Sequence, residues 1–319
     1  MYPKIIDKMK SLLFLYFCVA MAFSAMASSV SDTYVIPNPQ QMVCGDGHFV
    51  LRTQASFSCN LTGTDKDDFV SYVSNSPLSL TYKKKGKADI TFKLVSPENA
   101  KMKEEAYRLK VTKKGIQAEA TSASGLFYAF QSIVQLARES GNGTYRLPEV
   151  TIEDAPRFSY RGMHLDVSRH FYTKEFVKKQ IDALARYKLN RFHWHLTDGA
   201  GWRIEIKKYP ELTRETAYRP FPDWKSWWNG GRTYCRQDAL GASGGYYTQE
   251  DVKEIVEYAR QRHITVIPEI EMPAHSEEVL AALPQLACGG DLKPGGEFCP
   301  GKELTYEFLT NVFKEVMEL

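Results

Sequence analysis

The sequence is poor in three features, and each absence removes a class of protein from consideration. Its 41 Lys and Arg nearly balance 38 Asp and Glu, which leaves a net charge of +3, so no nucleic-acid partner is expected. It has only 6 cysteines, without a CxxC motif or a Cys/His cluster, so we expect no cysteine-held metal cage. After the first 27 residues no stretch approaches about 18 consecutive apolar residues, so no membrane span is expected there.

What remains is an ordinary globular composition. The chain has 319 residues, of which 43% are hydrophobic, 25% charged and 13% aromatic. These proportions exclude a disordered, collagenous or coiled-coil protein. The length allows two domains, each large enough to bury a core of its own.

The first 27 residues have the layout of a secretory signal peptide. Lys4, Lys8 and Lys10 precede an apolar run over 12–23, and the small-residue triplet Ala-Met-Ala follows at 25–27. Such a segment is too short to span a membrane and ends in a cleavage site. We therefore predict an exported protein in the periplasm, outside the cell or on its surface.

Five cysteines remain after the predicted cleavage. In an oxidising compartment, cysteines that are close in sequence are the easiest to join, because closing a short loop loses little entropy. The predicted disulfides are Cys44–Cys59 and Cys288–Cys299, which leaves Cys235 over.

Residues 28–155 have the short, mixed rhythm of a small α/β domain. The segments 90–95 and 107–111 alternate between apolar and polar residues, as strands do. Apolar residues then recur at helical spacing over 126–136. The pattern predicts a helix on an antiparallel sheet, and Asp-Ala-Pro at 154–156 predicts the end of the domain.

Residues 156–319 change to an alternation of strands and helices, which predicts parallel strands with crossover helices. A closed (β/α)8 barrel takes roughly 250 residues, and three parallel strands with open edges could not cover their own apolar faces. We therefore expect a TIM barrel of which only about the first three units are present. The expected strands are 160–167, 191–196 and 264–270, and the expected helices are 174–187, 249–263 and 304–319.

Acidic and imidazole side chains follow two of these strands. In parallel α/β folds the working residues gather at the carboxyl ends of the strands. Asp198 follows the second strand, and Glu271 and His275 follow the third, so a carboxylate and an imidazole are expected to meet there. An Asx turn or a helix cap explains Asp198 equally well on spacing alone.

His193 and His195 offer a metal-binding alternative. Two imidazoles two residues apart share one face of a strand, and with Asp198 and His275 nearby they could hold catalytic zinc. Barrel interiors also accept hydrogen-bonded histidines as structural filling. We favour that second interpretation.

All five tryptophans fall between 194 and 228, partly in a loop over 214–246 that is far longer than usual. Aromatic rings near a barrel mouth suit the faces of pyranose sugars, but rings also fill cores. We expect Trp194 and Trp202 to be buried in the core. For Trp227 and Trp228 two alternatives are open, namely that they face a substrate or that they fix the loop.

Arg161 is the remaining candidate. It lies in the first predicted barrel strand, where a buried guanidinium needs partners. Its planar fork suits adjacent sugar hydroxyls, and an ion pair with a barrel carboxylate such as Asp166 is the alternative.

Three segments together resemble the β-N-acetylhexosaminidases of glycoside hydrolase family 20. They are Tyr-Arg-Gly-Met-His-Leu-Asp-Val-Ser-Arg-His from Tyr160, His-Leu-Thr-Asp-Gly-Ala-Gly-Trp-Arg-Ile-Glu-Ile from His195, and Pro-Glu-Ile-Glu-Met-Pro-Ala-His from Pro268. They look like the first three barrel strands of that family, and a small α/β domain ahead of the barrel is also usual there. Glu271 and Ala274 depart from the Asp and Gly that are common in the family.

The resemblance implies exo-hydrolysis of terminal N-acetylglucosamine or N-acetylgalactosamine with retained configuration. In that mechanism the substrate's own acetamido oxygen attacks the anomeric carbon and forms an oxazoline. By carry-over, Arg161 would hold distal sugar hydroxyls, and Asp198 with His275 would support the catalytic Glu. The implied partner is an amino-sugar oligosaccharide or glycan, and neither a metal nor an organic cofactor is implied.

The family's catalytic Asp-Glu pair belongs to a His-X-Gly-Gly-Asp-Glu segment, and this sequence has no such segment. We therefore expect an amino-terminal portion of such an enzyme that is inactive alone, with the pair expected after Leu319. Two alternatives remain open. One is a non-catalytic sugar-binding protein, and the other is a metal-dependent hydrolase using His193, His195 and Asp198.

Overall fold

The computed structural model of the chain describes residues 33–100, 102–288 and 296–319. The predicted signal peptide, 1–27, lies outside the described residues. Within them, no helix combines the length and apolar character that a membrane crossing requires.

The amino-terminal half forms one large sheet with the strand order β1-β8-β5-β6-β4-β2-β3, and β7 pairs with β8. Its strands are β1 (Gln41–Leu51), β2 (Ser56–Cys59), β3 (Thr81–Tyr82), β4 (Ile90–Leu94), β5 (Tyr107–Thr112), β6 (Gly115–Ala120), β7 (Arg138–Glu139) and β8 (Tyr145–Asp154). Pairing from β1 to β6 is antiparallel, whereas β6, β4, β2 and β3 pair in parallel. The prediction of an antiparallel sheet was therefore wrong for one half of it.

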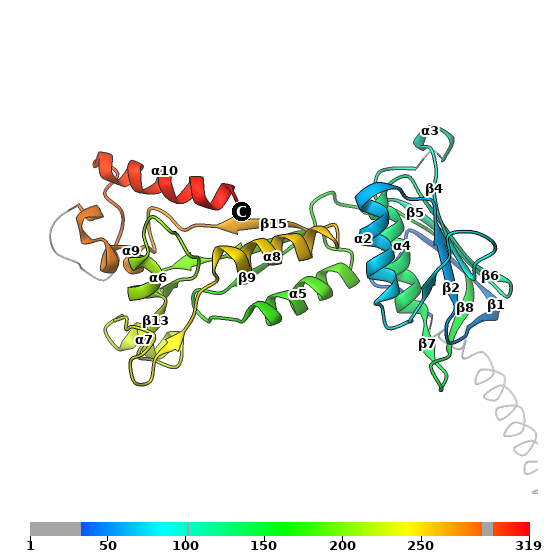
Figure 1. Cartoon of the computed structure of the whole chain (residues 1–319), viewed down its shortest axis with the longest axis horizontal. Helices are drawn as coiled ribbons and strands as arrows, with labels where there is room; N and C mark the ends of the chain where they lie inside the picture. The colour runs from blue at the N-terminus through cyan, green and yellow to red at the C-terminus, as the bar shows by residue number, and fades with distance from the viewer. Residues whose placement is uncertain (1–32, 101, 289–295) are drawn as a thin grey trace, which may run out of the picture. The chain divides into compact units, whose positions relative to one another are not determined.

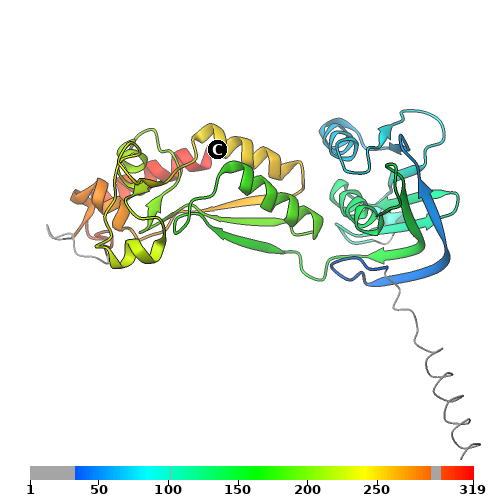
Figure 2. The same cartoon turned by 90° about the horizontal axis from the view of Figure 1, so that it is seen from below.

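A helix that the sequence patterns did not indicate explains the parallel half. α2 (Gly63–Ser74) follows β2 and returns the chain so that β3 runs parallel to β2, and the connection 83–89 then brings β4 parallel to β2 on its other side. Crossover connections of this kind are what parallel strands need. α2 and the predicted helix, α4 (Ala123–Leu136), lie side by side on one face of the sheet (Figures 1 and 2). A short helix, α3 (Pro97–Ala100), follows β4.

The core of this half is aromatic. Phe69 of α2 meets Phe92 of β4 edge-on with ring centroids 4.9 Å apart, and Phe92 meets Phe130 of α4 at 6.1 Å. α4 begins where Ser122 Oγ accepts a hydrogen bond from the Gly125 amide, as a helix N-cap does.

The predicted Cys44–Cys59 disulfide is wrong, because both cysteines are free. Cys44 lies on β1 and Cys59 ends β2, and five strand-to-strand steps separate these two strands. At about 4.8 Å per step the strands are roughly 24 Å apart, well beyond the reach of a disulfide. Proximity in sequence could not show that β1 and β2 occupy distant positions in the sheet.

The carboxy-terminal half contains three parallel strands in the order β15-β10-β9. They are β9 (Gly162–Asp166), β10 (Arg191–His195) and β15 (Thr265–Glu269), and their crossover helices are α5 (Lys174–Arg186) and α8 (Gln249–Arg260). All five coincide with predicted segments to within a few residues. Both helices run along one face of this sheet (Figures 1 and 2).

Alternation along β10 separates the two faces. Phe192 and Trp194 are fully buried, as are Ile181 of α5 and Ile255 of α8. Because successive strand residues point to opposite faces, His193 and its neighbour at 195 lie on the face away from these helices. In the predicted TIM barrel that face would be the interior, and imidazoles would line it.

The long connection between β10 and α8 is built of short elements rather than being an open loop. It contains β11 (Thr197–Asp198), β12 (Gly201–Trp202), α6 (Glu211–Thr216), β13 (Tyr218–Arg219), α7 (Trp224–Asn229) and β14 (Ser243–Gly244). β11 pairs with β12 and β13 with β14, both antiparallel. The connection after β15 contains α9 (Glu277–Ala282), a 3-10 turn (Pro284–Leu286) and then α10 (Glu303–Met317).

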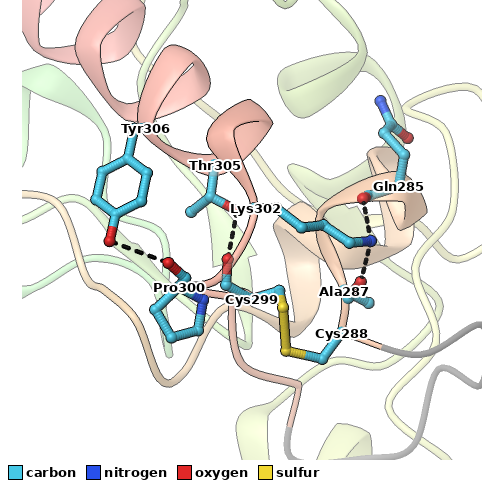
Figure 3. The surroundings of a disulfide bond; sticks show 8 residues. All are labelled: Gln285, Ala287, Cys288, Cys299, Pro300, Lys302, Thr305 and Tyr306. Carbon is cyan, nitrogen blue, oxygen red and sulfur yellow. Dashed lines mark hydrogen bonds between the residues drawn. A yellow bond between two sulfur atoms is a disulfide. The ribbon is translucent and has the colours of Figure 1, made fainter.

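The second predicted disulfide, Cys288–Cys299, is confirmed. Figure 3 shows it between the 3-10 turn and α10, where Lys302 Nζ donates to the backbone carbonyls of Gln285 and Ala287. The disulfide and this ammonium group together fix the ends of the connection before α10. Cys235, which the sequence left over, is free.

Candidate functional site at the carboxyl ends of the barrel strands

Asp198 and His275 meet, as the strand-end argument predicted. His275 Nδ1 lies 3.2 Å from Asp198 Oδ2, although 77 residues separate them. Asp198 is 5% exposed, whereas the His275 side chain is 57% exposed. The pair therefore joins a buried carboxylate to an imidazole that solvent or a ligand can reach.

Arg169, which the sequence analysis did not single out, completes this cluster. Its Nη2 lies 2.7 Å from Asp198 Oδ2 and its Nη1 donates to Asp166 Oδ2 at 2.9 Å. The Asp166 carboxylate also accepts the backbone amides of Ser168 and Arg169, at 2.9 and 3.0 Å. Asp166 ends β9, so this turn places a guanidinium at the same strand ends as Asp198. A signal was present, since Arg169 stands two residues after the end of the predicted barrel strand 160–167.

His195 lies between two carboxylates. Its Nε2 lies 3.1 Å from Asp198 Oδ2, and its Nδ1 lies 2.6 Å from Glu269 Oε2. Burial by itself would lower the pKa of His195, but hydrogen bonds with Asp198 and Glu269 and the charge of Asp166 raise it to about 9. An imidazole in this setting holds its proton at neutral pH. It therefore joins the Asp198 cluster to the barrel interior.

Glu269 is shared among three imidazoles. Its Oε2 lies 2.7 Å from His193 Nε2 and 3.5 Å from His164 Nε2, in addition to its contact with His195. Burial raises the pKa of Glu269, but the hydrogen bond and charge of His195, with the charges of His193 and His164, lower it overall. Both predicted imidazoles thus have the Glu269 carboxylate as a close partner in the barrel interior.

The alternative zinc set of His193, His195 and Asp198 is not brought together. Among the described residues, potential ligand atoms lie within 4.8 Å of one another in three groups, and none contains both His193 and Asp198. The reason is the strand itself, because two residues of β10 extend about 6.6 Å. His193 therefore lies deeper in the barrel, beside His164.

Glu271 lies beside the same cluster. Its backbone amide donates to Thr197 Oγ1 at 2.9 Å, and its Oε1 lies 3.6 Å from His275 Nδ1. Burial, together with the charges of Asp198 and Glu269, raises the pKa of Glu271. The geometry places this residue at the site.

Arg161 is not at this site. It precedes β9 at the amino end of the strand and binds Glu105, through Nη1–Oε2 at 3.0 Å and Nη2–Oε1 at 3.2 Å. Its Nε donates to the Lys188 carbonyl at 2.7 Å. The alternative ion pair with Asp166 is also wrong, since Asp166 pairs with Arg169. Because β9 begins only at Gly162, Arg161 lies a full strand length from the carboxyl end.

The tryptophans divide by burial. Trp194 and Trp202 are fully buried, as expected, and Trp227 is 1% exposed, so it fixes the loop rather than facing a substrate. Trp228 is 45% exposed, and the Arg232 guanidinium lies 3.5 Å from its ring centroid. One face of the Trp228 ring is therefore already occupied.

Carboxylates, imidazoles and a guanidinium gather at the carboxyl ends of the parallel strands, which is where TIM-barrel enzymes carry their active sites. The profile described as "Glycosyl hydrolase family 20, catalytic domain" matches residues 158–319. The profile described as "Glycosyl hydrolase family 20, domain 2" matches residues 32–155. The chain belongs to glycosyl hydrolase family 20.

Individual relatives agree with this assignment. A beta-hexosaminidase of Porphyromonas gingivalis is 45% identical over 232 residues, covering 68% of this chain and 28% of the relative. A beta-hexosaminidase of Vibrio furnissii is 36% identical over 310 residues, covering 92% of this chain and 48% of the relative. The chain therefore spans about half the length of the relatives it matches, or less.

Solved structures show the same fold. The exo β-N-acetylglucosaminidase of Vibrio harveyi, in complex with N-acetylglucosamine, matches with a TM-score of 0.75 and 32% identity over 91% of this chain and 46% of its own. The β-N-acetylhexosaminidase of Bacteroides fragilis matches with a TM-score of 0.75 and 34% identity over 90% of this chain and 55% of its own. The three parallel strands are thus part of a TIM barrel, as predicted.

Proposed function

We propose that this chain is part of an exo-acting β-N-acetylhexosaminidase that releases terminal N-acetylglucosamine or N-acetylgalactosamine from a glycan. Membership of the family supports the reaction class. The observation that carries the proposal for this chain is the contact of Asp198 with both Arg169 and His275 at the barrel mouth.

Each residue of the cluster has a role in this proposal. The guanidinium of Arg169, one-third exposed, donates to adjacent hydroxyls of the terminal sugar, because its planar fork matches such pairs. This role replaces the one that the resemblance assigned to Arg161. Asp198, which contacts both His195 and His275, supports the catalytic acid from behind.

The reaction proceeds in two steps with retention. The acetamido oxygen of the substrate attacks the anomeric carbon while an enzyme carboxylic acid protonates the departing glycosidic oxygen, which yields an oxazoline and the shortened glycan. Water then opens the oxazoline and returns the proton to the carboxylate. The sequence holds no His-X-Gly-Gly-Asp-Glu segment to supply that acid, so we propose that the chain alone does not turn over.

We also propose export, to the periplasm, the cell surface or the medium. The charged, apolar and small-residue order of residues 1–27 supports it. The Cys288–Cys299 disulfide supports it independently, because disulfides persist in oxidising compartments.

An aryl N-acetylglucosaminide assay tests the catalytic proposal. We expect no release of the aryl group by the purified chain, and release at ordinary enzyme rates by a longer protein that carries this chain together with the Asp-Glu pair. A chain that hydrolyses the substrate at full rate would show that its acid lies among residues already present.

Titration with N-acetylglucosamine tests the binding role separately. We expect the Arg169→Met variant to bind the sugar at least tenfold more weakly than the unsubstituted chain, and the Arg161→Met variant to bind it unchanged. Equal affinity in all three proteins would contradict the role given to Arg169. Binding without turnover in any longer protein would favour the non-catalytic sugar-binding alternative.

A further inference from the structure

Two arginine side chains lie buried directly behind the cluster of Arg169, Asp198 and His275. Arg203, which follows β12, is 1% exposed, and Arg219, which ends β13, is 3% exposed. In the described part of the chain neither forms an ion pair with a carboxylate. Their hydrogen-bond partners are backbone carbonyl groups instead.

Arg203 joins three separate segments. Its Nη2 donates to the carbonyls of Ser168 at 2.7 Å and Ala200 at 3.3 Å, while its Nη1 donates to Gly245 at 3.2 Å and to Ala217. Ser168 belongs to the loop after β9, and Ala200 to the turn between β11 and β12. One planar group therefore fixes the loop and the turn to each other.

Arg219 also connects the loop after β9 to the turn between β11 and β12, and it does so at Arg169, one residue after Ser168. Its Nη2 donates to the Arg169 carbonyl at 2.7 Å and its Nη1 to the Ala200 carbonyl at 3.4 Å. A third connection comes from Ser168, whose Oγ lies 3.0 Å from the Asp198 carbonyl and 2.9 Å from that of Gly201. The backbone on both sides of the Arg169–Asp198 contact is thus held by the same groups.

Burial of these guanidinium groups is unfavourable by itself. It lowers the pKa of Arg203 to about 10, and it also lowers the pKa of Arg219. A protein in which apolar side chains replace buried charged ones is often as stable or more stable. Stability alone therefore does not explain why arginine stands at these two positions. What a guanidinium provides is a rigid fork of donors that fits several carbonyls at once.

The backbone is shaped to admit the Arg203 guanidinium. A Cβ atom added at Gly201 would lie 2.5 Å from Arg203 Cζ, and one added at Gly244 would lie 3.0 Å from Arg203 Nη1. Only glycine leaves enough room at Gly201, where the backbone passes directly over the planar group. Close approach of this kind is a common reason for glycine in a turn.

We propose that Arg203 and Arg219 are positioning residues that hold the Arg169 guanidinium against the Asp198 carboxylate, so that the sugar-binding geometry exists before the ligand arrives. This inference rests on the proposed function for its purpose, but the contacts themselves do not depend on it. Preorganised donors of this kind bind ligands without first losing conformational entropy.

Amide hydrogen exchange of the purified chain tests the proposal. The Arg219→Met substitution keeps the length of the side chain and removes its donors. We expect exchange at 166–170 and 197–201 to rise at least tenfold, while exchange within α8 changes less than twofold. Equal acceleration in both regions, or none at the loop and turn, would show that Arg219 serves only general stability.

Two further variants keep this test decisive. Arg262→Met is the matched control, because Arg262 binds Asp182 through Nε–Oδ1 at 2.7 Å, remote from Arg169. We expect it to accelerate exchange near 182 and 258 and not at the loop and turn. If Arg219→Met does not fold, Arg219→Lys replaces it in the test. Lysine retains the charge, but its single ammonium group cannot reach both the Arg169 and the Ala200 carbonyls. We then expect a smaller rise in exchange at the same residues, 166–170 and 197–201.

Titration with N-acetylglucosamine separates this inference from the proposed function. We expect Arg219→Met to weaken sugar binding at least fivefold and Arg262→Met to leave it unchanged. Unchanged binding in Arg219→Met despite faster local exchange would overturn the positioning role. If the unsubstituted chain does not bind the sugar, the proposed function fails for this chain, and the exchange pattern alone then decides whether the two arginines hold the site.

Discussion

The Arg169 guanidinium contacts the Asp198 carboxylate, with Nη2 2.7 Å from Oδ2. Arg169 follows the carboxyl end of β9, and Asp198 follows the carboxyl end of the neighbouring strand β10. Parallel pairing sets this distance, because Asp166, which ends β9, stands opposite His195, which ends β10. The turn after each strand then directs one charged side chain toward the other. A buried carboxylate needs charged or hydrogen-bonding partners, and Asp198 has a guanidinium and two imidazoles.

Removing the Asp198 charge should lower the pKa of His195. Burial alone lowers that pKa, and hydrogen bonds from the imidazole to Asp198 and Glu269 raise it to about 9. In Asp198→Asn we expect a fall of about one unit or more, which NMR titration of the imidazole measures. Asp182→Asn, on the outer face of α5, is the control that should leave the value unchanged.

The same contact predicts a pH dependence of stability. Because the folded pKa of His195, about 9, exceeds its unfolded value of about 6.5, the protonated imidazole contributes stability fully below pH 6.5. This contribution is lost as the pH rises toward 9. Urea unfolding between pH 6 and 9 should therefore show a steeper loss of stability in the unsubstituted chain than in Asp198→Asn. Parallel curves for the two proteins would contradict the bridging role of His195.

Arg161 and Arg169 should have opposite phenotypes. Arg161→Met leaves the partly buried Glu105 carboxylate without its guanidinium, so we expect a loss of about 3 kcal/mol in the free energy of unfolding. Arg169→Met should change stability less and sugar binding more. Urea unfolding measures the first effect and sugar titration the second. An Arg161→Met protein of full stability would show that its pair with Glu105 is screened by solvent.

Much of the fold could be predicted because its signals are local. Periodicity found β10, α5 and α8 to within a few residues, and strand-helix alternation identified parallel strands. The direction of β2 to β4 could not be predicted, since α2 has a weakly apolar face and buries only Phe69 and Val73. Sheet order is also invisible in local patterns, which is why Cys44 and Cys59 looked like partners.

For the site, sequence reasoning succeeded where strand ends were correctly located. Asp198 and His275 follow the ends of β10 and β15, so their meeting was predictable. Arg161 was misplaced because the first strand was taken to begin at 160, which made an amino-end residue look interior. Choosing Arg169 instead required knowing that β9 stops at Asp166 and that the next turn folds back. The sequence places Arg169 just after a predicted strand, but only the three-dimensional path of the turn shows that its guanidinium reaches Asp198.

Loss of the Cys288–Cys299 disulfide should destabilise the chain. The two cysteines are 11 residues apart, and closing a loop of that length is worth about 2 to 3 kcal/mol in the chain-entropy model. We expect Cys299→Ser to lower the free energy of urea unfolding by that amount under oxidising conditions. Cys235→Ser, at a free thiol, is the matched control and should have little effect. A similar stability of both variants would show that the loop is held by Lys302 rather than by the disulfide.

Glu278 is the buried acid that the site does not use. It is fully buried, and neither of its carboxylate oxygens has a hydrogen-bond partner among the described residues. Burial, with the charges of Asp198 and Glu277, raises the pKa of Glu278 well above 4.5. A raised folded pKa contributes stability that is fully present below the unfolded pKa and is lost as the pH rises. The uncharged, isosteric Glu278→Gln variant should avoid this loss.

We therefore expect Glu278→Gln to match the unsubstituted chain in urea unfolding near pH 4 and to become the more stable protein as the pH rises, by about 1.4 kcal/mol per pH unit at most. Glu257→Gln is a control of opposite sign, because hydrogen bonds from Arg260 and Gln261 lower the pKa of Glu257 to about 2. That exposed variant should gain no stability at high pH. A Glu278→Gln protein that is less stable than the unsubstituted chain at pH 8 would mean that Glu278 is charged at that pH and that the fold stabilises the charged form.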